Sequence, residues 1–381
     1  MHLSTDTSIN KLSCEIKKEL EYVAKIIKGE LNGKNSDEKE AIRRIYYNRA
    51  RQTYSSFLKY FEKKMDYLLT FFANGTDVIP EKISPRVEIV NAQNVSSEIF
   101  RFASLLWSIP VTPGYGRRIR FLVWDDNNDK LIGIIGLADP VFNLNPRDEF
   151  FQWSSKDREK LIKYIMNAYV LGAVPPYNSL LGGKLIACLI RSNDVAEIFR
   201  TKYQGSVGII SKEEDSPHLV AVTTTSALGR SSIYNRLKLG NITYFKSVGY
   251  TKGYGHFHIS DELFGKMREY LSLIGHNYHN GHSFGNGPNW KMRTIRACLK
   301  SLNVDSEIAR HGVRREVFIS SLANNALAFL QGKDHLIKFD NLLSIDQISK
   351  LAIERWLLPR SIRRPEYREW KNAKLPELIV K

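Results

Sequence analysis

The sequence predicts an α+β protein in which a mixed β-sheet core is flanked by an N-terminal helical hairpin and a mainly helical C-terminal region. Two observations predict this class. In the middle of the chain, apolar β-branched runs alternate with segments whose apolar residues recur every three or four positions. At both ends, the helical spacing dominates. With 381 residues, the chain has the length of two or three folded units.

Residues 1–75 are expected to form the helical hairpin. The first helix carries one apolar stripe that runs from Ile9 to Ile27. The second helix begins after Ser36, whose hydroxyl is a suitable N-cap, and continues to about Phe72. Residues 76–109 are expected to be a linker with a short helix, because an NGTD sequence and two prolines interrupt the regular pattern.

Residues 110–260 are expected to form the sheet core. The runs IRFLVW and LIGIIGL, separated by DDNNDK, predict a β-hairpin, and the second run is apolar at nearly every position, as in a central strand covered on both faces. The pattern then predicts a helix at 156–168, a strand at 169–174, a helix at 184–203, a strand at 219–225, a short helix, and a strand at 242–250. Residues 261–381 are expected to be mainly helical and basic, with a capping box at Ser344.

This element order is similar to that of the acyl-CoA-dependent N-acetyltransferase fold, so an acyltransferase-like core is expected by analogy. The resemblance implies a cofactor loop after the fourth strand, in which a Gln or Arg precedes closely spaced glycines. Here that loop reads PPYNSLLGGKL, with Ser179 in the leading position and Lys184 in the place of the last glycine. We therefore expect neither acyl-CoA nor another cofactor.

Composition excludes several classes of protein. No run reaches the ~18 apolar residues that cross a bilayer, and the N-terminus has no basic stretch followed by an apolar block. A cytoplasmic protein without a membrane partner is expected. The three cysteines, Cys14, Cys188 and Cys298, are too few and too far apart for a disulfide framework or a thiolate zinc site.

The charge of the chain is strongly basic and uneven. There are 56 lysines and arginines against 40 aspartates and glutamates. Between Ser216 and Val304, 11 basic residues face 3 acidic ones, which gives this window a net charge of +8, half of the total of +16. Such a concentration is typical of proteins that bind a polyanion such as nucleic acid. The alternative is a generally basic surface without a partner.

The densest polar segment follows the strand at 219–225 and reads TTTSALGRSSIYNRLKLG. Hydroxyls and free backbone N–H groups at a helix N-terminus, with an arginine beside them, favour an anion. The alternative is that the Ser and Thr residues only cap the helix. The candidate anion-binding residues here and in the glycine loop are Lys184, Thr225, Ser226, Arg230, Ser231, Arg236 and Lys238.

A second cluster combines aromatic and basic residues in VGYTKGYGHFHIS. Exposed tyrosines between basic residues provide stacking surfaces for bases, so Tyr250, Lys252 and Tyr254 are candidate nucleic-acid contacts. Lys291 and Arg293 extend the basic surface and join this candidate set.

No catalytic residue is assigned, but four side chains are candidates. Asp139 and Asp148 follow a buried strand, where a carboxylate can serve as a base, although turn or capping roles are the alternative. His256 and His258 share one face if their segment is a strand. No cysteine or carboxylate lies at a recognisable ligand spacing beside them, so no metal site is predicted.

Several long motifs occur in one order: ADPVFNL, LGAVPPYNSLLGGKLIACLIRS, VTTTSALGRSSIYNRLKLG, VGYTKGYGHFHIS and, farther on, HGVRREVF. From about Pro110 to Phe318 the chain resembles the DruA family of Druantia anti-phage systems. The resemblance implies a role in bacterial defence against phage, beside other subunits that include a large helicase-like protein. The resemblance supplies no assigned catalytic residues to carry over to this chain.

Three functional hypotheses remain open. The first is a defence subunit that binds nucleic acid, with foreign DNA as the expected partner. The second is an enzyme of acyltransferase-like fold that modifies a small molecule, a protein or a nucleic acid. The third is an assembly module whose basic face docks an acidic partner subunit.

Overall fold

The computed structural model describes residues 2–27, 59–107, 114–208, 218–227, 231–253, 259–280, 290–305 and 314–380, together with residues 109, 111, 112, 214, 216, 229 and 307. The chain divides into two compact units. The helical unit comprises Met1–Gln52 and Thr251–Arg315, and the sheet unit comprises Thr53–Tyr250 and Glu316–Lys381.

The helical unit contains α1 (His2–Ile27), α9 (Asp261–Leu273), the 3₁₀ turn η5 (Asn277–Asn280) and α10 (Trp290–Ser301). Its core confirms the predicted stripe of α1, since Ile16 and Leu20 are fully buried together with Leu263 and Met267 of α9. Ser260 caps α9 by accepting a hydrogen bond from Leu263 N at 3.0 Å. Most of the second helix predicted for the hairpin lies outside the described residues.

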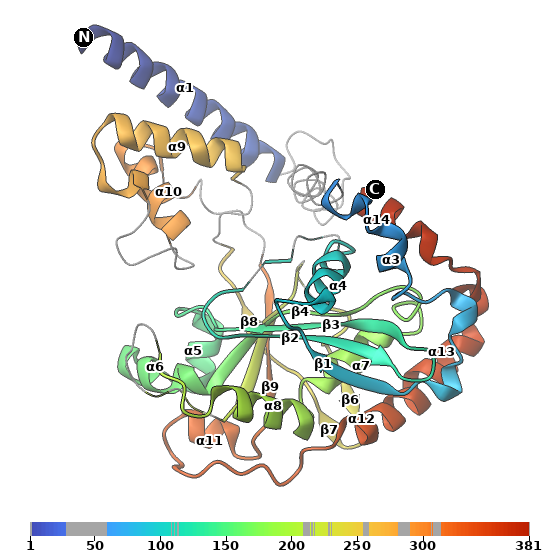
Figure 1. The fold of residues 1–381 in the computed structure, drawn as a ribbon. Helices are drawn as coiled ribbons and strands as arrows, with labels where there is room; N and C mark the ends of the chain where they lie inside the picture. The colour runs from blue at the N-terminus through green and yellow to red at the C-terminus, as the bar shows by residue number, and fades with distance from the viewer. Residues whose placement is uncertain are drawn as a thin grey trace. The chain divides into compact units, whose positions relative to one another are not determined.

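The sheet unit is built on a seven-stranded mixed sheet in the order β1-β2-β3-β4-β5-β9-β8 (Figure 1). The strands are β1 (Pro85–Ile89), β2 (Arg118–Asp125), β3 (Lys130–Ala138), β4 (Ile165–Ala173), β5 (Ala221–Thr225), β8 (Lys246–Tyr250) and β9 (Glu316–Ser321). Within it β4 and β5 are parallel, and the other neighbouring strands are antiparallel. This arrangement confirms the α+β class, the hairpin at 119–137 and the mixed sheet.

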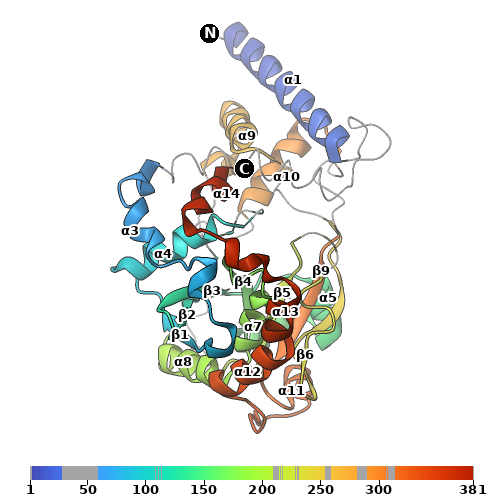
Figure 2. The same cartoon turned by 90° about the vertical axis from the view of Figure 1, so that its right-hand side faces the viewer.

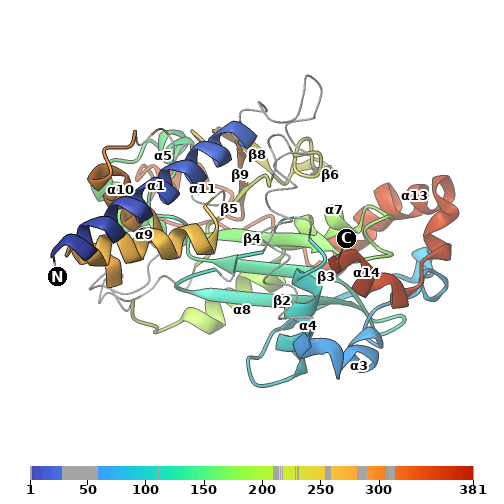
Figure 3. The same cartoon turned by 90° about the horizontal axis from the view of Figure 1, so that it is seen from above.

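Both faces of the central strands are covered, as the sequence predicts for β3. On β2, Ile119, Phe121 and Val123 face one apolar cluster, whereas Leu122 and Trp124 face another. The first cluster lies under α7 (Gly182–Leu189), α8 (Asn193–Tyr203) and α12 (Ile345–Ala352), and the second lies under α3 (Met65–Leu69), α4 (Val95–Ser104) and α14 (Leu375–Val380). Figure 3 shows β2, β3 and β4 side by side.

Several elements differ from the sequence-based expectations. The linker contains strand β1, and the region expected to be mainly helical contributes β9, which lies between β5 and β8. The helix expected at 184–203 is two helices, because Ser192 begins a new one by capping Val195 N at 3.1 Å. The short helix expected after β5 is a run of turns. The strand expected at 242–250 is divided between β7 (Ile242–Thr243), which pairs with β6 (Lys238–Leu239), and β8.

The C-terminal segment returns to the start of the sheet unit. After α12 come a π-helical turn η7 (Ile353–Leu357), α13 (Leu358–Arg363) and the 3₁₀ turns η8 (Pro365–Glu369) and η9 (Asn372–Lys374). In Figure 2 these red and orange elements lie beside α7, with which α12 is in contact. Gly75 N donates to Trp370 O at 2.9 Å, and a Cβ atom on Gly75 would lie 2.0 Å from Tyr367 O. This close approach requires glycine.

The described residues also include α5 (Asn145–Phe151), α6 (Ser155–Leu161) and η4 (Ile162–Tyr164) between β3 and β4, α11 (Ala326–Leu330) after β9, and the short turns η2 (Gly75–Asp77) and η3 (Pro80–Lys82). Throughout the described parts of the chain, no helix is both long enough and apolar enough to span a bilayer.

The packing of α1 on α9 yields a first prediction. We expect Leu20→Ala to lower the opening free energy of α9 and α10 by about 2–5 kcal/mol, because it leaves a cavity in place of the buried leucine side chain. Hydrogen exchange of the full-length protein measures this quantity. Lys17→Ala, at an exposed position of the same helix, is the control. Unchanged exchange of α9 in the Leu20 variant would show that the stability of α9 does not depend on its packing against α1.

Candidate functional site

The site is defined by the ends of the parallel strands. In sheets with parallel strands, loops at the carboxyl ends of neighbouring strands form the usual ligand crevice. Here the loop after β4 leads to α7, and the segment 226–236 follows β5. A Cβ atom on Gly183 would lie 3.7 Å from Ile233 Cδ1, so the two loops adjoin. We call this place the parallel-strand edge.

Buried hydroxyls join β4 and β5 as they approach this edge. Thr223 Oγ1 donates to Met166 O at 3.3 Å, and Thr224 Oγ1 donates to Ala168 O at 2.9 Å. Both threonine side chains are buried, whereas Thr225 is half-buried. The first two threonines of the TTT run therefore stabilise the sheet, and Thr225 is the one at the edge.

A buried carboxylate that sequence reasoning missed organises the segment after β5. Glu316 is 4% exposed and stands opposite Tyr250 at the start of β9. Its Oε2 accepts from Asn235 Nδ2 at 2.9 Å and from Ser231 N at 3.3 Å. Its Oε1 accepts from Ser247 Oγ at 2.8 Å. The only signal in the sequence is an acidic residue at the start of an apolar run.

The predicted serines belong to this network. Ser226 is buried, and its Oγ accepts from Glu316 N at 2.9 Å and donates to Gly229 O. Ser231 Oγ accepts from Ile233 N and Tyr234 N, both at 3.2 Å. The Ser226 and Ser231 hydroxyls are thus used within the turns that follow β5, and anion binding by this segment stays a prediction.

The predicted basic residues of the sheet unit lie around this edge in different environments. Arg236 is exposed and has a φ of 61°, and Lys238 is exposed on β6. In the described part of the chain, no ion pair engages either of them. The Lys184 ammonium lies 5.3 Å from the centroid of the Trp356 ring, which is a cation–π contact. Tyr250, at the end of β8, is 40% exposed.

Some of the other predicted nucleic-acid contacts lie in the helical unit, and the rest are not among the described residues. Lys252 and Arg293 are exposed, whereas Lys291 Nζ lies 3.1 Å from Asp261 Oδ1 and 5.1 Å from the centroid of the Phe264 ring. Four predicted residues, Arg230, Tyr254, His256 and His258, lie outside the described residues.

Of the two candidate aspartates, Asp139 lies at the opposite edge of the sheet, because β3 and β4 are antiparallel and Ala138 stands opposite Asn167. Asp139 accepts from Arg117 Nε at 2.8 Å and from Arg117 N at 2.9 Å. The side chain of Arg117 is 10% exposed and also donates to Lys163 O. Asp139 therefore closes a charged turn after β3.

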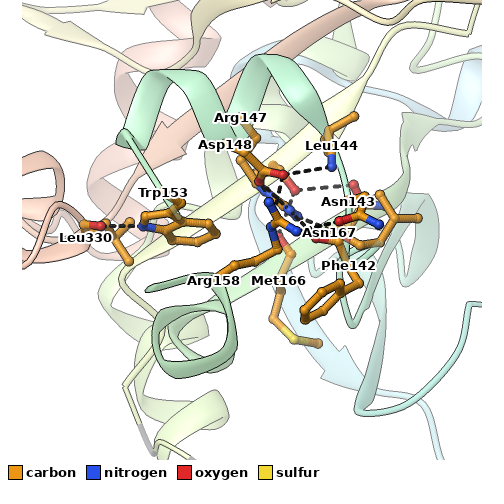
Figure 4. Close-up of polar contacts among 12 residues, drawn as sticks. Phe142, Asn143, Leu144, Arg147, Asp148, Trp153, Arg158, Met166, Asn167 and Leu330 are labelled. Carbon is orange, nitrogen blue, oxygen red and sulfur yellow. Dashed lines mark hydrogen bonds and ion pairs between the residues drawn. The ribbon is translucent and has the colours of Figure 1, made fainter. Parts of the chain in front are cut away.

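Asp148 belongs to a denser cluster, shown in Figure 4. Its carboxylate lies 2.6 Å from Arg147 Nη2 and 3.1 Å from Arg158 Nε, and it accepts from Leu144 N at 3.1 Å. Arg147 is fully buried and donates to the carbonyls of Val141 and Phe142, both at 2.7 Å. Burial lowers the pKa of Arg147, and the neighbouring Asp148 charge opposes that shift.

These contacts favour a structural role for both aspartates. Every polar group of the buried guanidinium has a partner: a carboxylate or a carbonyl accepts from each nitrogen of Arg147. A catalytic base must be able to reach a substrate proton, whereas the carboxylates of Asp139 and Asp148 are engaged by arginines. Within the described residues, no group of three or more His, Cys, Asp or Glu side chains could hold a metal ion.

The architecture is that of a basic α+β protein with a mixed sheet, in which a helical segment is inserted in the chain between the paired strands β8 and β9. Residues 36–332 match the family model described as "Druantia protein DruA". The chain is also 48% identical over 341 residues to the Druantia protein DruA of Escherichia coli (strain UMEA 4076-1), which covers 90% of this chain and 84% of that relative. The chain belongs to the DruA family.

Membership makes the protein a component of a Druantia anti-phage defence system and implies that it acts with other Druantia subunits. No solved structure matches the chain. The acyltransferase-like element order thus stays a prediction.

The ion cluster at Asp148 yields a second prediction. Asp148→Ala is expected to cost about 3–5 kcal/mol of unfolding free energy, because it leaves the buried Arg147 charge without its carboxylate. Urea denaturation measures this loss. Asp139→Ala should cost less, since the Asp139 side chain is 28% exposed. An Asp148 variant with wild-type stability but no phage protection would instead support the catalytic interpretation.

The Glu316 network yields a third prediction. Glu316→Ala should remove hydrogen bonds from half-buried donors, at a cost of about 0.5–1.5 kcal/mol for each, and should speed hydrogen exchange at Ser231. Glu316→Gln is the matched control, because its amide oxygen can still accept from Asn235 and Ser231. Equal exchange in the alanine variant and the wild type would show that the carboxylate does not hold this segment.

Proposed function

We propose that the chain is a nucleic-acid-binding subunit of its Druantia system that contacts foreign DNA through basic surfaces and acts with a helicase-like partner. The observation that supports this best is the outer face of α10. Arg293, Arg296 and Lys300 are all exposed there. At 100° per residue, their spacings of three and seven residues place them within about 60° of one another around the helix axis. The three charges form one stripe.

The stripe has the properties of a phosphate contact surface. Its opposite side is apolar, since Ile295, Cys298 and Leu299 are buried, so the helix is fixed while the charges face solvent. In the described part of the chain, neither Arg296 nor Lys300 forms an ion pair. Exposed cations release condensed counterions when they neutralise phosphates, which supplies affinity for DNA of any sequence.

The sheet unit carries a smaller basic group of the same kind. Arg236 and Lys238 are exposed on the turn and on the short β6–β7 hairpin next to the parallel-strand edge. Leu237 and Leu239, which alternate with them, are buried. The alternation directs both charges toward solvent.

A salt series tests the proposal. The wild-type protein should bind duplex DNA with micromolar or tighter affinity at low salt, as non-specific binders do. Changing Arg293, Arg296 and Lys300 to Ala should lower the slope of log K against log salt by up to about 2.7, at about 0.9 per phosphate contact. Fluorescence anisotropy measures both quantities.

The control removes three charges elsewhere. Lys156 and Lys160 of α6 and Lys350 of α12 are exposed, and their change to Ala alters the net charge equally. A similar loss of slope in both triple variants would mean that only the total charge counts. The absence of DNA binding by the wild type at 50 mM salt would contradict the proposal.

Acyl transfer is the rival function, and one observation favours it: the parallel β4–β5 pair inside an otherwise antiparallel sheet, with glycines beginning α7 at its carboxyl end. The residues fit acyl-CoA poorly, however. Lys184 occupies the place of a glycine, and its ammonium is held by Trp356.

Calorimetry with acetyl-CoA separates the two functions. Our proposal expects no saturable binding. An isotherm that is lost in Gly183→Leu would favour acyl transfer. Gly183 is the suitable position because an added Cβ meets only Ile233, whereas one on Gly182 would lie 2.7 Å from Tyr177 O and distort the loop.

A further inference from the structure

The C-terminal segment of the sheet unit exposes an isoleucine among arginines. Ile362 is 81% exposed, more than any other large apolar residue in the described part of the chain. Arg360 lies before it, and Arg363 and Arg364 follow it directly. We call residues 360–364 the arginine tip. It lies beyond residues 36–332, which the family model matches.

The residues on either side of the arginine tip are well packed. Trp356 and Leu357 of η7 are buried, and Tyr367 after the tip is 4% exposed. Arg360 Nε donates to Ser179 O at 3.1 Å, and Ser361 Oγ donates to Leu358 O at 2.8 Å. Ile362 is thus exposed although the residues before and after the arginine tip are packed against the rest of the sheet unit.

The π-helical turn that precedes the tip supports a functional interpretation. π-helical turns are rare, and they occur frequently at functional sites. The turn Ile353–Leu357 passes directly into α13, which carries the tip. A π-helical turn holds one more residue than an α-helical turn, so it rotates the residues of α13 around the helix axis. The turn therefore determines which side chain of α13 faces solvent.

The charge around Ile362 favours a polyanion. From Ile353 to Lys374 there are 7 basic residues, Arg355, Arg360, Arg363, Arg364, Arg368, Lys371 and Lys374, against 3 acidic ones, so the segment has a net charge of +4. One isolated apolar side chain is far smaller than the ~1,000 Å² that a protein interface requires. Nucleic acid needs less apolar surface, because a single side chain can enter between two base pairs.

We propose that the arginine tip is a minor-groove wedge for duplex DNA. The inference rests on the proposed function, since it requires that the chain binds nucleic acid. Ile362 inserts at a base step and partly unstacks it, as apolar wedges of minor-groove proteins do. Arg363 and Arg364 lie along the groove walls, where a narrow A·T-rich groove concentrates negative potential.

The test measures unstacking and affinity separately. A duplex with an A·T-rich centre carries 2-aminopurine at one step, whose fluorescence rises when the base unstacks. The wild-type protein should raise this fluorescence, and Ile362→Ala should abolish most of the rise while its affinity changes by less than about tenfold, since charge supplies most of the binding. Leu336→Ala is the matched control, because Leu336 is 72% exposed in the same unit.

A competitor and a charge variant complete the experiment. Netropsin, which fills the A·T minor groove, should suppress the fluorescence rise. Changing Arg363 and Arg364 to Ala should lower the salt slope by up to about 1.8 and also reduce the rise.

The outcomes distinguish the two proposals. Binding by the wild type without any fluorescence rise, or an equal rise in the Ile362 and wild-type proteins, would overturn the wedge and leave the proposed function standing. The absence of DNA binding by the wild type would overturn both. Equal loss in the Ile362 and Leu336 variants would also contradict the wedge, because it would assign the effect to exposed apolar surface in general.

Discussion

The burial of the central strands on both faces is the constraint on which the sheet unit depends. On β2, alternate side chains enter two different apolar clusters, and on β3 every residue from Leu131 to Ala138 is buried. A strand of this kind leaves no face for polar chemistry, so ionisable side chains must gather where strands end. The Asp139–Arg117 pair after β3 and the Glu316 network at the start of β9 both lie at such strand ends.

Two buried carboxylates solve the same electrostatic problem in different ways. On α5, the buried Arg147 and the neighbouring Arg158 share Asp148, so that opposite charges compensate one another. At the parallel-strand edge, Glu316 accepts from Asn235, Ser231 and Ser247, which are neutral donors. An ion pair fixes a turn by charge, whereas hydrogen bonds from neutral groups fix a segment by geometry. The adjoining loops after β4 and β5 also lie at the parallel-strand edge.

The charges proposed to contact DNA lie outside these networks. The α10 stripe, the Arg236 and Lys238 pair, and the arginine tip are each carried by an element whose apolar side is buried. Because the element that carries each group is packed, its backbone loses little conformational entropy on binding, which favours association with a polyanion. This distribution agrees with a defence subunit that must hold DNA of many sequences, because phosphate contacts carry no sequence information.

The sequence by itself determined the elements whose signals are local. The stripe of α1, the hairpin at 119–137, the capping box at Ser344 and the buried nature of β3 depend on residues a few positions apart, and all are present in the structure. The DruA family was also evident in the order of the motifs, and the comparisons confirm it.

Only the tertiary structure decided what depends on residues far apart. β9 pairs with β5, and Glu316 contacts Ser226, a residue 90 positions away. The same is true of the Trp356 partner of Lys184 and the exposure of Ile362. A short apolar run such as EVFISS has no local feature that distinguishes a sheet strand from part of a helix. The sequence next to a charged residue likewise does not show which residue it will contact. Those assignments follow from which segments the folded chain brings together, because burial and pairing are properties of the whole sheet and not of any one segment.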